Sequence, residues 1–190
     1  MKFFAGFLLS IAASNVCLVQ ATPAHAEVTP RVISVLQRIG IDLNINSKSC
    51  GPSRSGSGGL YGYYEPGPNR MCIVDHSIIG ASAWYRTLMH ESWHVVQDAI
   101  GGGINTSQMM GVGEYALRTQ GKADATKIFE NFIKGNTREQ IKWAQKYATS
   151  HKDDSVIGME FEAVLVEEKP RVVLESLESI CKHWPCPGGY

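Results

Sequence analysis

The chain has 190 residues with 18 basic and 18 acidic side chains, so its formal net charge at pH 7 is zero. This balance gives no electrostatic reason to expect binding to nucleic acid or to an anionic membrane surface. Hydrophobic residues make up 44% of the chain, which is enough for one domain with its own core.

The N-terminus has the parts of a secretory signal peptide. Met1-Lys2 supplies a positive start, residues 3–19 form an uncharged apolar run, and Ala24-His25-Ala26 supplies small residues for cleavage. We therefore expect a signal peptide at 1–26, cleavage after Ala26, and a single mature domain at 27–190 in a secreted or periplasmic location. After cleavage we expect no stable membrane association. The alternative is an uncleaved membrane anchor, although polar residues make the run a weak span.

Four cysteines follow the predicted cleavage site, and an even number in an exported protein predicts two disulfides. We expect Cys50–Cys72 and Cys181–Cys186, because each of these pairs closes a local segment. The stretch "CKHWPC" offers an alternative in which its cysteines and His183 form a second metal site.

The first half of the mature chain predicts a helix, a loop and a β-hairpin. Thr29 as a cap and Pro30 as the first helical residue start a helix that Gly40 ends. A polar, glycine-rich loop follows at 46–59. Strands are then expected at Leu60–Tyr64 and Arg70–Val74, joined by the turn "EPGPN".

The rest of the chain is predicted to be helical. A long helix starts near Ser82 and ends at the glycines 101–103. Apolar residues cover much of its circumference, which indicates that it is buried in the centre of the domain. Further helices are expected at 107–121, 123–135, 137–151, 154–169 and from Pro170 onward, the third of them opening with a Thr-x-x-Gln capping box. The expected fold class is α+β, mainly helical, with a small sheet before the central helix.

The central helix carries "HESWH", in which His90 and His94 are four residues apart with Glu91 between them. On a helix these histidines share one face and can offer ring nitrogens to one ion. Glu91 can then reach a metal-bound water, as in the His-Glu-x-x-His pattern of zinc hydrolases. The alternative is an ordinary core helix whose histidines are satisfied by hydrogen bonds.

A catalytic zinc site needs a third protein ligand, which must come from elsewhere in the chain. The best donor segment is "GMEFEAVLVEE", because an acid among apolar neighbours is costly to bury without a partner or a metal. Either Glu160 or Glu162 in this segment fits that role. Glu114 and His151 are the other candidates.

"LMHESWHVVQD" followed by "MEFEA" resembles the gluzincin branch of zinc metallopeptidases, particularly its small minimal-gluzincin domains. The resemblance implies a zincin-like fold, an edge strand before the central helix that holds the substrate backbone, and Glu160 as the third ligand through Glu-x-x-Ala. The sequence departs from the family at Val164, where an Asp or Asn usually braces a histidine. Gln97 or Asp98 would then have to brace it.

Together these features predict a secreted or periplasmic zinc metallopeptidase that acts on a peptide or protein substrate. Zinc would be held by His90, His94 and Glu160, and Glu91 would be the general base toward a zinc-activated water. The candidates for stabilising the oxyanion are Tyr115, Tyr147 and His151. Two alternatives stay open: an exported, disulfide-stabilised binding protein with a structural or vestigial metal site, and a zinc hydrolase of a non-peptide cell-envelope substrate.

Overall fold

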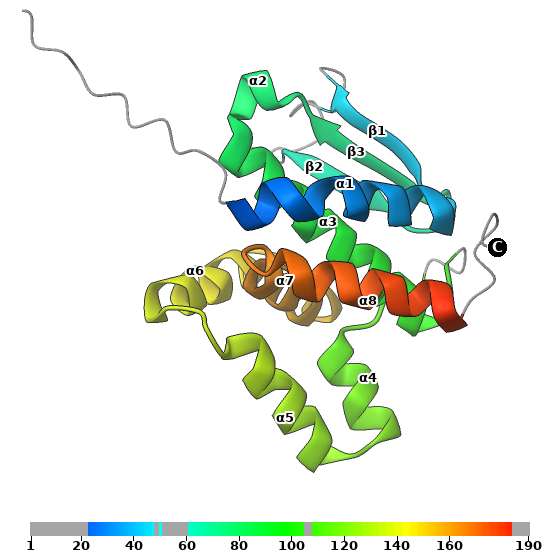
Figure 1. The fold of residues 1–190 in the computed structure, drawn as a ribbon. Helices are drawn as coiled ribbons and strands as arrows, with labels where there is room; N and C mark the ends of the chain where they lie inside the picture. The colour runs from blue at the N-terminus through cyan, green and yellow to red at the C-terminus, as the bar shows by residue number, and fades with distance from the viewer. Residues whose placement is uncertain (1–22, 48–49, 51–60, 105–107, 184–190) are drawn as a thin grey trace, which may run out of the picture.

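The computed structural model describes residues 23–47, 50, 61–104 and 108–183. Across these residues the chain forms helices around a small three-stranded sheet, as Figure 1 shows. The expected α+β class, mainly helical with its sheet before the central helix, is confirmed. Within the part of the chain described, no helix has the length and hydropathy that a membrane span requires. The predicted apolar run of the signal peptide lies outside it.

The sheet contains β1 (Asp42–Ser47), β2 (Gly62–Glu65) and β3 (Arg70–Val74) in the order β1-β3-β2. The hairpin of β2 and β3 matches the prediction, and β3 has the predicted bounds. β1, which pairs in parallel with β3, was not predicted. Its signal is the alternation of apolar and polar residues in "DLNINS", which is typical of a strand with one buried face.

The two faces of β3 meet different surroundings because its side chains alternate. Met71 and Ile73 point into the main core with the helices, whereas Cys72 and Val74 lie in a smaller cluster on the other face. That second cluster includes Cys50, which forms a disulfide with Cys72, as predicted. In the predicted Cys181–Cys186 pair, Cys186 lies outside the described residues.

Helix α1 (Pro23–Ile39) begins earlier than predicted. The expectation of Thr29 as the cap and Pro30 as the first residue was wrong, since Pro30 lies inside the helix. Val28 is buried in the core, and its packing offsets the hydrogen bond that Pro30 cannot donate. The predicted cleavage point after Ala26 therefore lies within α1, and a mature chain from Glu27 keeps its buried residues.

The short helix α2 (His76–Ile79) leads into α3 (Ala81–Gly101), which runs through the middle of the molecule (Figure 1). Every residue of α3 from Leu88 to Asp98 is buried, so the predicted central position is confirmed. β2 and β3 pack against it on one side, and helices from the second half of the chain pack against it on the other.

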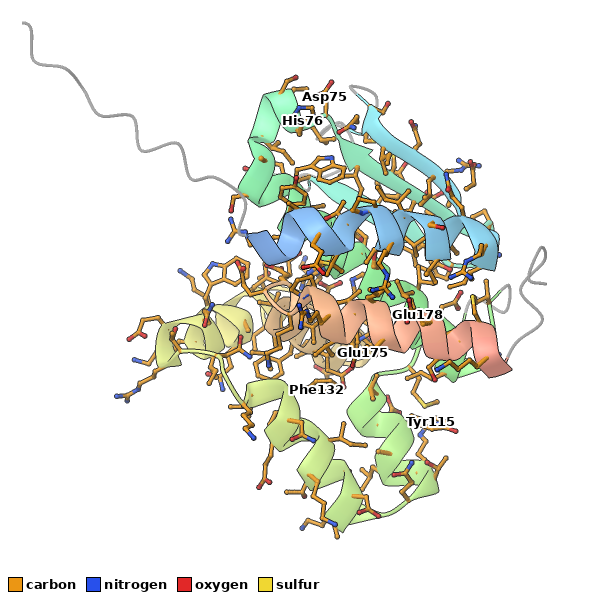
Figure 2. All side chains as sticks on the ribbon, viewed as in Figure 1. Asp75, His76, Tyr115, Phe132, Glu175 and Glu178 are labelled. Carbon is orange, nitrogen blue, oxygen red and sulfur yellow. A yellow bond between two sulfur atoms is a disulfide. The ribbon has the colours of Figure 1, made fainter. Side chains whose placement is uncertain are left out.

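The second half is helical, with α4 (Val112–Thr119), α5 (Lys122–Ile133), α6 (Arg138–Ala148), α7 (Asp154–Val166) and α8 (Pro170–His183). The predicted capping box of α6, between Thr137 and Gln140, is present. α7 and α8 pack on α3, and α8 also packs along α1. α4 and α5 form a hairpin at the lower end of Figure 1, where Phe132 of α5, labelled in Figure 2, contacts Trp93 of α3.

Candidate metal centre and cleft

Helices α3 and α7 bring the three predicted metal donors together. One donor atom from each of His90, His94 and Glu160 lies within 4.8 Å of the others. Glu160 Oε2 is 3.2 Å from His90 Nε2, and Glu160 Oε1 is 3.5 Å from His94 Nε2. The carboxylate thus lies between two imidazoles that share one face of α3. Two histidine nitrogens and one carboxylate form a donor set that zinc accepts.

The ring of His94 is held by Gln97, one of the two bracing residues that the sequence offered. His94 Nδ1 is 2.8 Å from Gln97 Oε1, and Gln97 Nε2 donates to the carbonyl oxygen of Met159 and to Glu162. Since both of those partners only accept, the amide must turn its oxygen toward His94. His94 therefore carries its proton on Nδ1, which leaves Nε2 directed at Glu160.

His90 is braced by an acid that the sequence analysis missed. His90 Nδ1 donates to Glu167 Oε1 at 3.0 Å, so Nε2 of this ring is also directed at Glu160. Glu167 follows the end of α7 and is seven residues after Glu160, a spacing that returns to the same helix face after two turns. That spacing was the available signal. Val164, the position at which the resemblance to gluzincins would lead one to expect Asp or Asn, is buried in the core.

Three other predicted candidates lie away from the donor cluster. The Glu162 carboxylate accepts hydrogen bonds from the backbone N–H groups of Val112 and Gly113, each at 2.8 Å, and this anchors the start of α4. Asp98 accepts from the Tyr64 hydroxyl at 2.9 Å, which ties α3 to β2 and takes Asp98 out of the bracing role. Glu114 pairs with Arg118 on the exposed side of α4.

Glu91 is buried, with 5% of its surface exposed, beside the donor cluster. Burial raises the pKa of Glu91 to about 7; the charge of His90 opposes this shift, and the charge of Glu160 adds to it. The backbone N–H of Tyr64 in β2 also stabilises the carboxylate. A carboxyl group with a pKa near neutrality can both accept and return a proton, which is the property of a general base.

The charges of the donor cluster are strongly coupled, and His90 must give up its Nε2 proton before it can bind a metal. Burial lowers the pKa of His90, but hydrogen bonds to Glu160 and Glu167 outweigh it and hold that pKa well above its ordinary value. Burial and the charge of His90 lower the pKa of His94 to about 4. Burial alone would raise the pKa of Glu160, yet the bond to His90 and the histidine charges bring it down to about 2. An ionised carboxylate and a neutral imidazole are the forms that bind metal.

Two adjoining pockets form a cleft over this cluster, with volumes of about 280 Å³ and about 230 Å³. They meet at the candidate base, because both are lined by Gly62, His90, Glu91 and Tyr147. Gly62 is the point where β2 approaches α3: a Cβ there would lie 2.7 Å from Thr87 Cγ2 and 2.9 Å from the carbonyl oxygen of Cys72. The missing side chain lets β2 form the rim of the cleft.

Comparisons with protein-family models, curated proteins and solved structures find no match for this chain. The functional argument therefore rests on the His-Glu-x-x-His motif and on the geometry of the cleft.

The structure separates the three candidates for oxyanion stabilisation. Tyr147 lines both pockets, and its ring meets the ring of His90 edge-on at 6.1 Å. His151 lines the smaller pocket, next to Tyr147 on the same helical stripe. Tyr115 lines neither pocket and lies on the α4–α5 hairpin at the lower end of the molecule, as its label in Figure 2 shows. Tyr147 is thus the tyrosine placed to reach a substrate in the cleft.

Proposed function

We propose that this protein is an exported zinc-dependent peptidase of the gluzincin type. One observation carries the proposal: two histidines and a glutamate converge beside a buried glutamate, at the floor of a cleft bordered by a β-strand. The match of "HESWH" and "EFEA" to the gluzincin pattern supports it, as does the disulfide, which is typical of an oxidising compartment.

The donors fit zinc in chemical type, and the lowered pKa values of His94 and Glu160 keep these two in the forms that bind metal. His90 and His94 each commit Nδ1 to a brace, so both Nε2 atoms are available on the side of Glu160. Among the described residues, His90, His94 and Glu160 group as metal donors, which makes three ligands. A structural zinc site uses four protein ligands. Zinc at such an open site supplies Lewis-acid chemistry, which makes water nucleophilic at neutral pH and polarises a carbonyl group. The three-ligand set favours a catalytic role over a structural one.

Glu91 then has the role of general base. Its carboxylate takes a proton from the attacking water and returns it to the leaving amine, which the raised pKa near neutrality permits. Burial and the nearby charges of Glu160, Glu91 and Glu167 raise the pKa of Tyr147, so its hydroxyl stays protonated. A protonated hydroxyl in the cleft can donate a hydrogen bond to the carbonyl oxygen as negative charge develops on it.

The rim of the cleft favours a peptide as the substrate. β2 is the outer strand on its side of the described sheet, and Gly62, Tyr63 and Tyr64 border the smaller pocket. An extended peptide laid along such a strand forms main-chain hydrogen bonds that do not depend on its sequence. We expect a peptide bound in this way to bring one of its carbonyl groups over His90, His94 and Glu91.

The test is hydrolysis of a mixed peptide library by the mature, zinc-loaded protein and by Glu91→Gln. The variant should keep its zinc and lose about 10²- to 10⁴-fold in rate, because the ligands remain and the proton acceptor is gone. Glu130→Gln makes the same chemical change on the exposed surface of α5 and should retain full activity. Undiminished hydrolysis by Glu91→Gln would contradict the proposed base. A zinc-loaded wild type that cleaves no peptide would contradict the peptidase.

A further inference from the structure

Two rows of side chains, each spaced four residues apart, face each other across the cleft. Arg86, His90 and His94 follow one another at intervals of four on α3, and Trp143, Tyr147 and His151 do the same along α6 and the turn that follows it. Arg86 and Trp143 line the larger pocket, His94 and His151 line the smaller one, and His90 and Tyr147 line both. His90 and His94 of the α3 row are the predicted metal donors. Arg86 lies about 6 Å from His90 along the helix, and neither it nor Trp143 has a part in holding a metal.

The larger pocket, which we call the aromatic pocket, is lined chiefly by Tyr61, Gly62, Arg86, Thr87, Trp143 and Tyr147. Its volume of about 280 Å³ is at the lower end of the range for ligand pockets, which suits one bulky side chain of a longer substrate. Glu91 also lines it, so a side chain in this pocket belongs to a residue next to the bond under attack. An extended chain advances by only about 3.3 Å per residue, which agrees with that position.

Two aromatic rings from distant parts of the chain stay partly exposed in this pocket. Trp143 is 51% exposed and Tyr61 is 46% exposed. Trp143 is nevertheless held in place, since its ring stacks on Tyr147 with a centroid distance of 5.3 Å and an interplanar angle of 13°. A single exposed aromatic residue needs no explanation. Two of them lining a pocket at the candidate base, one of them fixed by stacking, make a preformed surface for another ring.

Two of the charged side chains that line the pocket have partners within the protein. Glu167 accepts the hydrogen bond from His90 Nδ1, and Arg86 Nε lies 3.9 Å from Glu168 Oε1. A charged group of the substrate would have to compete with these pairs, whereas a neutral aromatic group would not. The compensation favours an apolar occupant.

We propose that the aromatic pocket selects peptides with Phe, Tyr or Trp next to the cleaved bond, and that Trp143 is the specificity-determining residue. This rests on the proposed peptidase function. Trp143 provides the flat surface against which the side chain packs, and Tyr147 sets the angle of that surface.

The experiment compares paired peptides that differ only in Phe or Ala at the residue next to the cleaved bond, which is located first by mass spectrometry of library products. For the wild type, kcat/KM should favour Phe by about 10- to 100-fold. Trp143→Ala should cut this ratio about tenfold and leave the zinc content unchanged, while Trp143→Phe should restore most of the ratio. Tyr115→Ala removes an aromatic residue of similar exposure away from the cleft and should leave the ratio unchanged.

A second readout does not depend on turnover. Calorimetric binding to Glu91→Gln of two short peptides that are identical except for one central Phe or Ala should show tighter binding of the Phe peptide, and adding Trp143→Ala should remove that difference. If the wild type cleaves neither peptide but this binding preference is present, the pocket inference stands and the peptidase proposal fails. An unchanged Phe-to-Ala ratio in a Trp143→Ala protein with native circular dichroism overturns the inference.

Discussion

Alanine substitutions at Glu160 and Glu162 are expected to have opposite consequences, although the two residues are neighbours on α7. Positions two apart on a helix point about 200° away from each other, so one of them faces α3 and the histidines while the other faces the start of α4. Glu162→Ala should lower the free energy of unfolding and leave zinc bound. Glu160→Ala should release the zinc, because it removes one of the three donors.

The size of the Glu162 effect follows from its hydrogen bonds. The carboxylate accepts from Gln97 Nε2 at 3.0 Å and from the N–H groups of Val112 and Gly113 at 2.8 Å. Hydrogen bonds to a charged acceptor contribute about 1.5–3 kcal/mol each. The free energy of unfolding lost in Glu162→Ala should be smaller than the sum over these bonds. Burial raises the pKa of Glu162, so desolvation of the ionised form offsets part of this gain, and the two backbone bonds are only partly buried. We therefore expect a loss of about 2–4 kcal/mol, or roughly 5–15 °C in Tm for a domain of this size.

The assay combines thermal unfolding with metal analysis of Glu160→Ala, Glu162→Ala and the exposed control Glu175→Ala on α8. Glu162→Ala should melt earlier and carry one zinc per chain, and the control should match the wild type in both measurements. The reasoning is refuted if Glu162→Ala loses the metal while Glu160→Ala keeps it.

Three further predictions concern the chain as exported and its metal site. Mass spectrometry of exported protein should show a start at Glu27 and no free thiols before reduction, and four alkylatable cysteines would contradict the two-disulfide prediction. His90→Ala and His94→Ala should each lose zinc, since one imidazole fewer leaves too few ligands for tight binding; full occupancy in either variant would contradict this. Glu167→Ala should weaken zinc affinity about 10- to 100-fold in competition with a chromogenic chelator, because His90 loses the brace on Nδ1, and an unchanged affinity would show that this carboxylate has no such role.

Local patterns in the sequence predicted the elements whose signals are local. The glycines at 101–103 predicted where α3 ends, and its apolar residues, spread around most of the helix, predicted its central position. The turn "EPGPN" located β3 directly after it. The start of α1 was missed because the rule for Thr29 and Pro30 is local, whereas the burial of Val28 depends on the packed core. β1 was missed even though Leu43 and Ile45 alternate with polar residues, since its parallel pairing with β3 joins segments distant in sequence.

The same division holds at the candidate metal centre. His90, Glu91 and His94 follow from helical spacing, and Glu160 follows from the resemblance to gluzincins. The structure brings donor atoms of His90, His94 and Glu160 within 4.8 Å of one another, and their roles stay predictions.

Glu167 and Trp143 were not identified, because their roles depend on which faces of α7 and α6 meet α3. That arrangement is set by packing between helices. The spacing of seven residues puts Glu167 on the same face as Glu160, but it does not report that this face meets α3. The choice of Tyr147 over Tyr115 likewise required the position of α6 beside the cleft.

Anomalous diffraction at the zinc edge from crystals of the purified mature protein tests the central claim most directly. We expect one zinc peak in the cleft, bound by Nε2 of His90, Nε2 of His94 and the carboxylate of Glu160, with the remaining position open toward Tyr147 and Glu91. A cleft without a peak after zinc loading, or a zinc closed off by a fourth protein ligand, would contradict it.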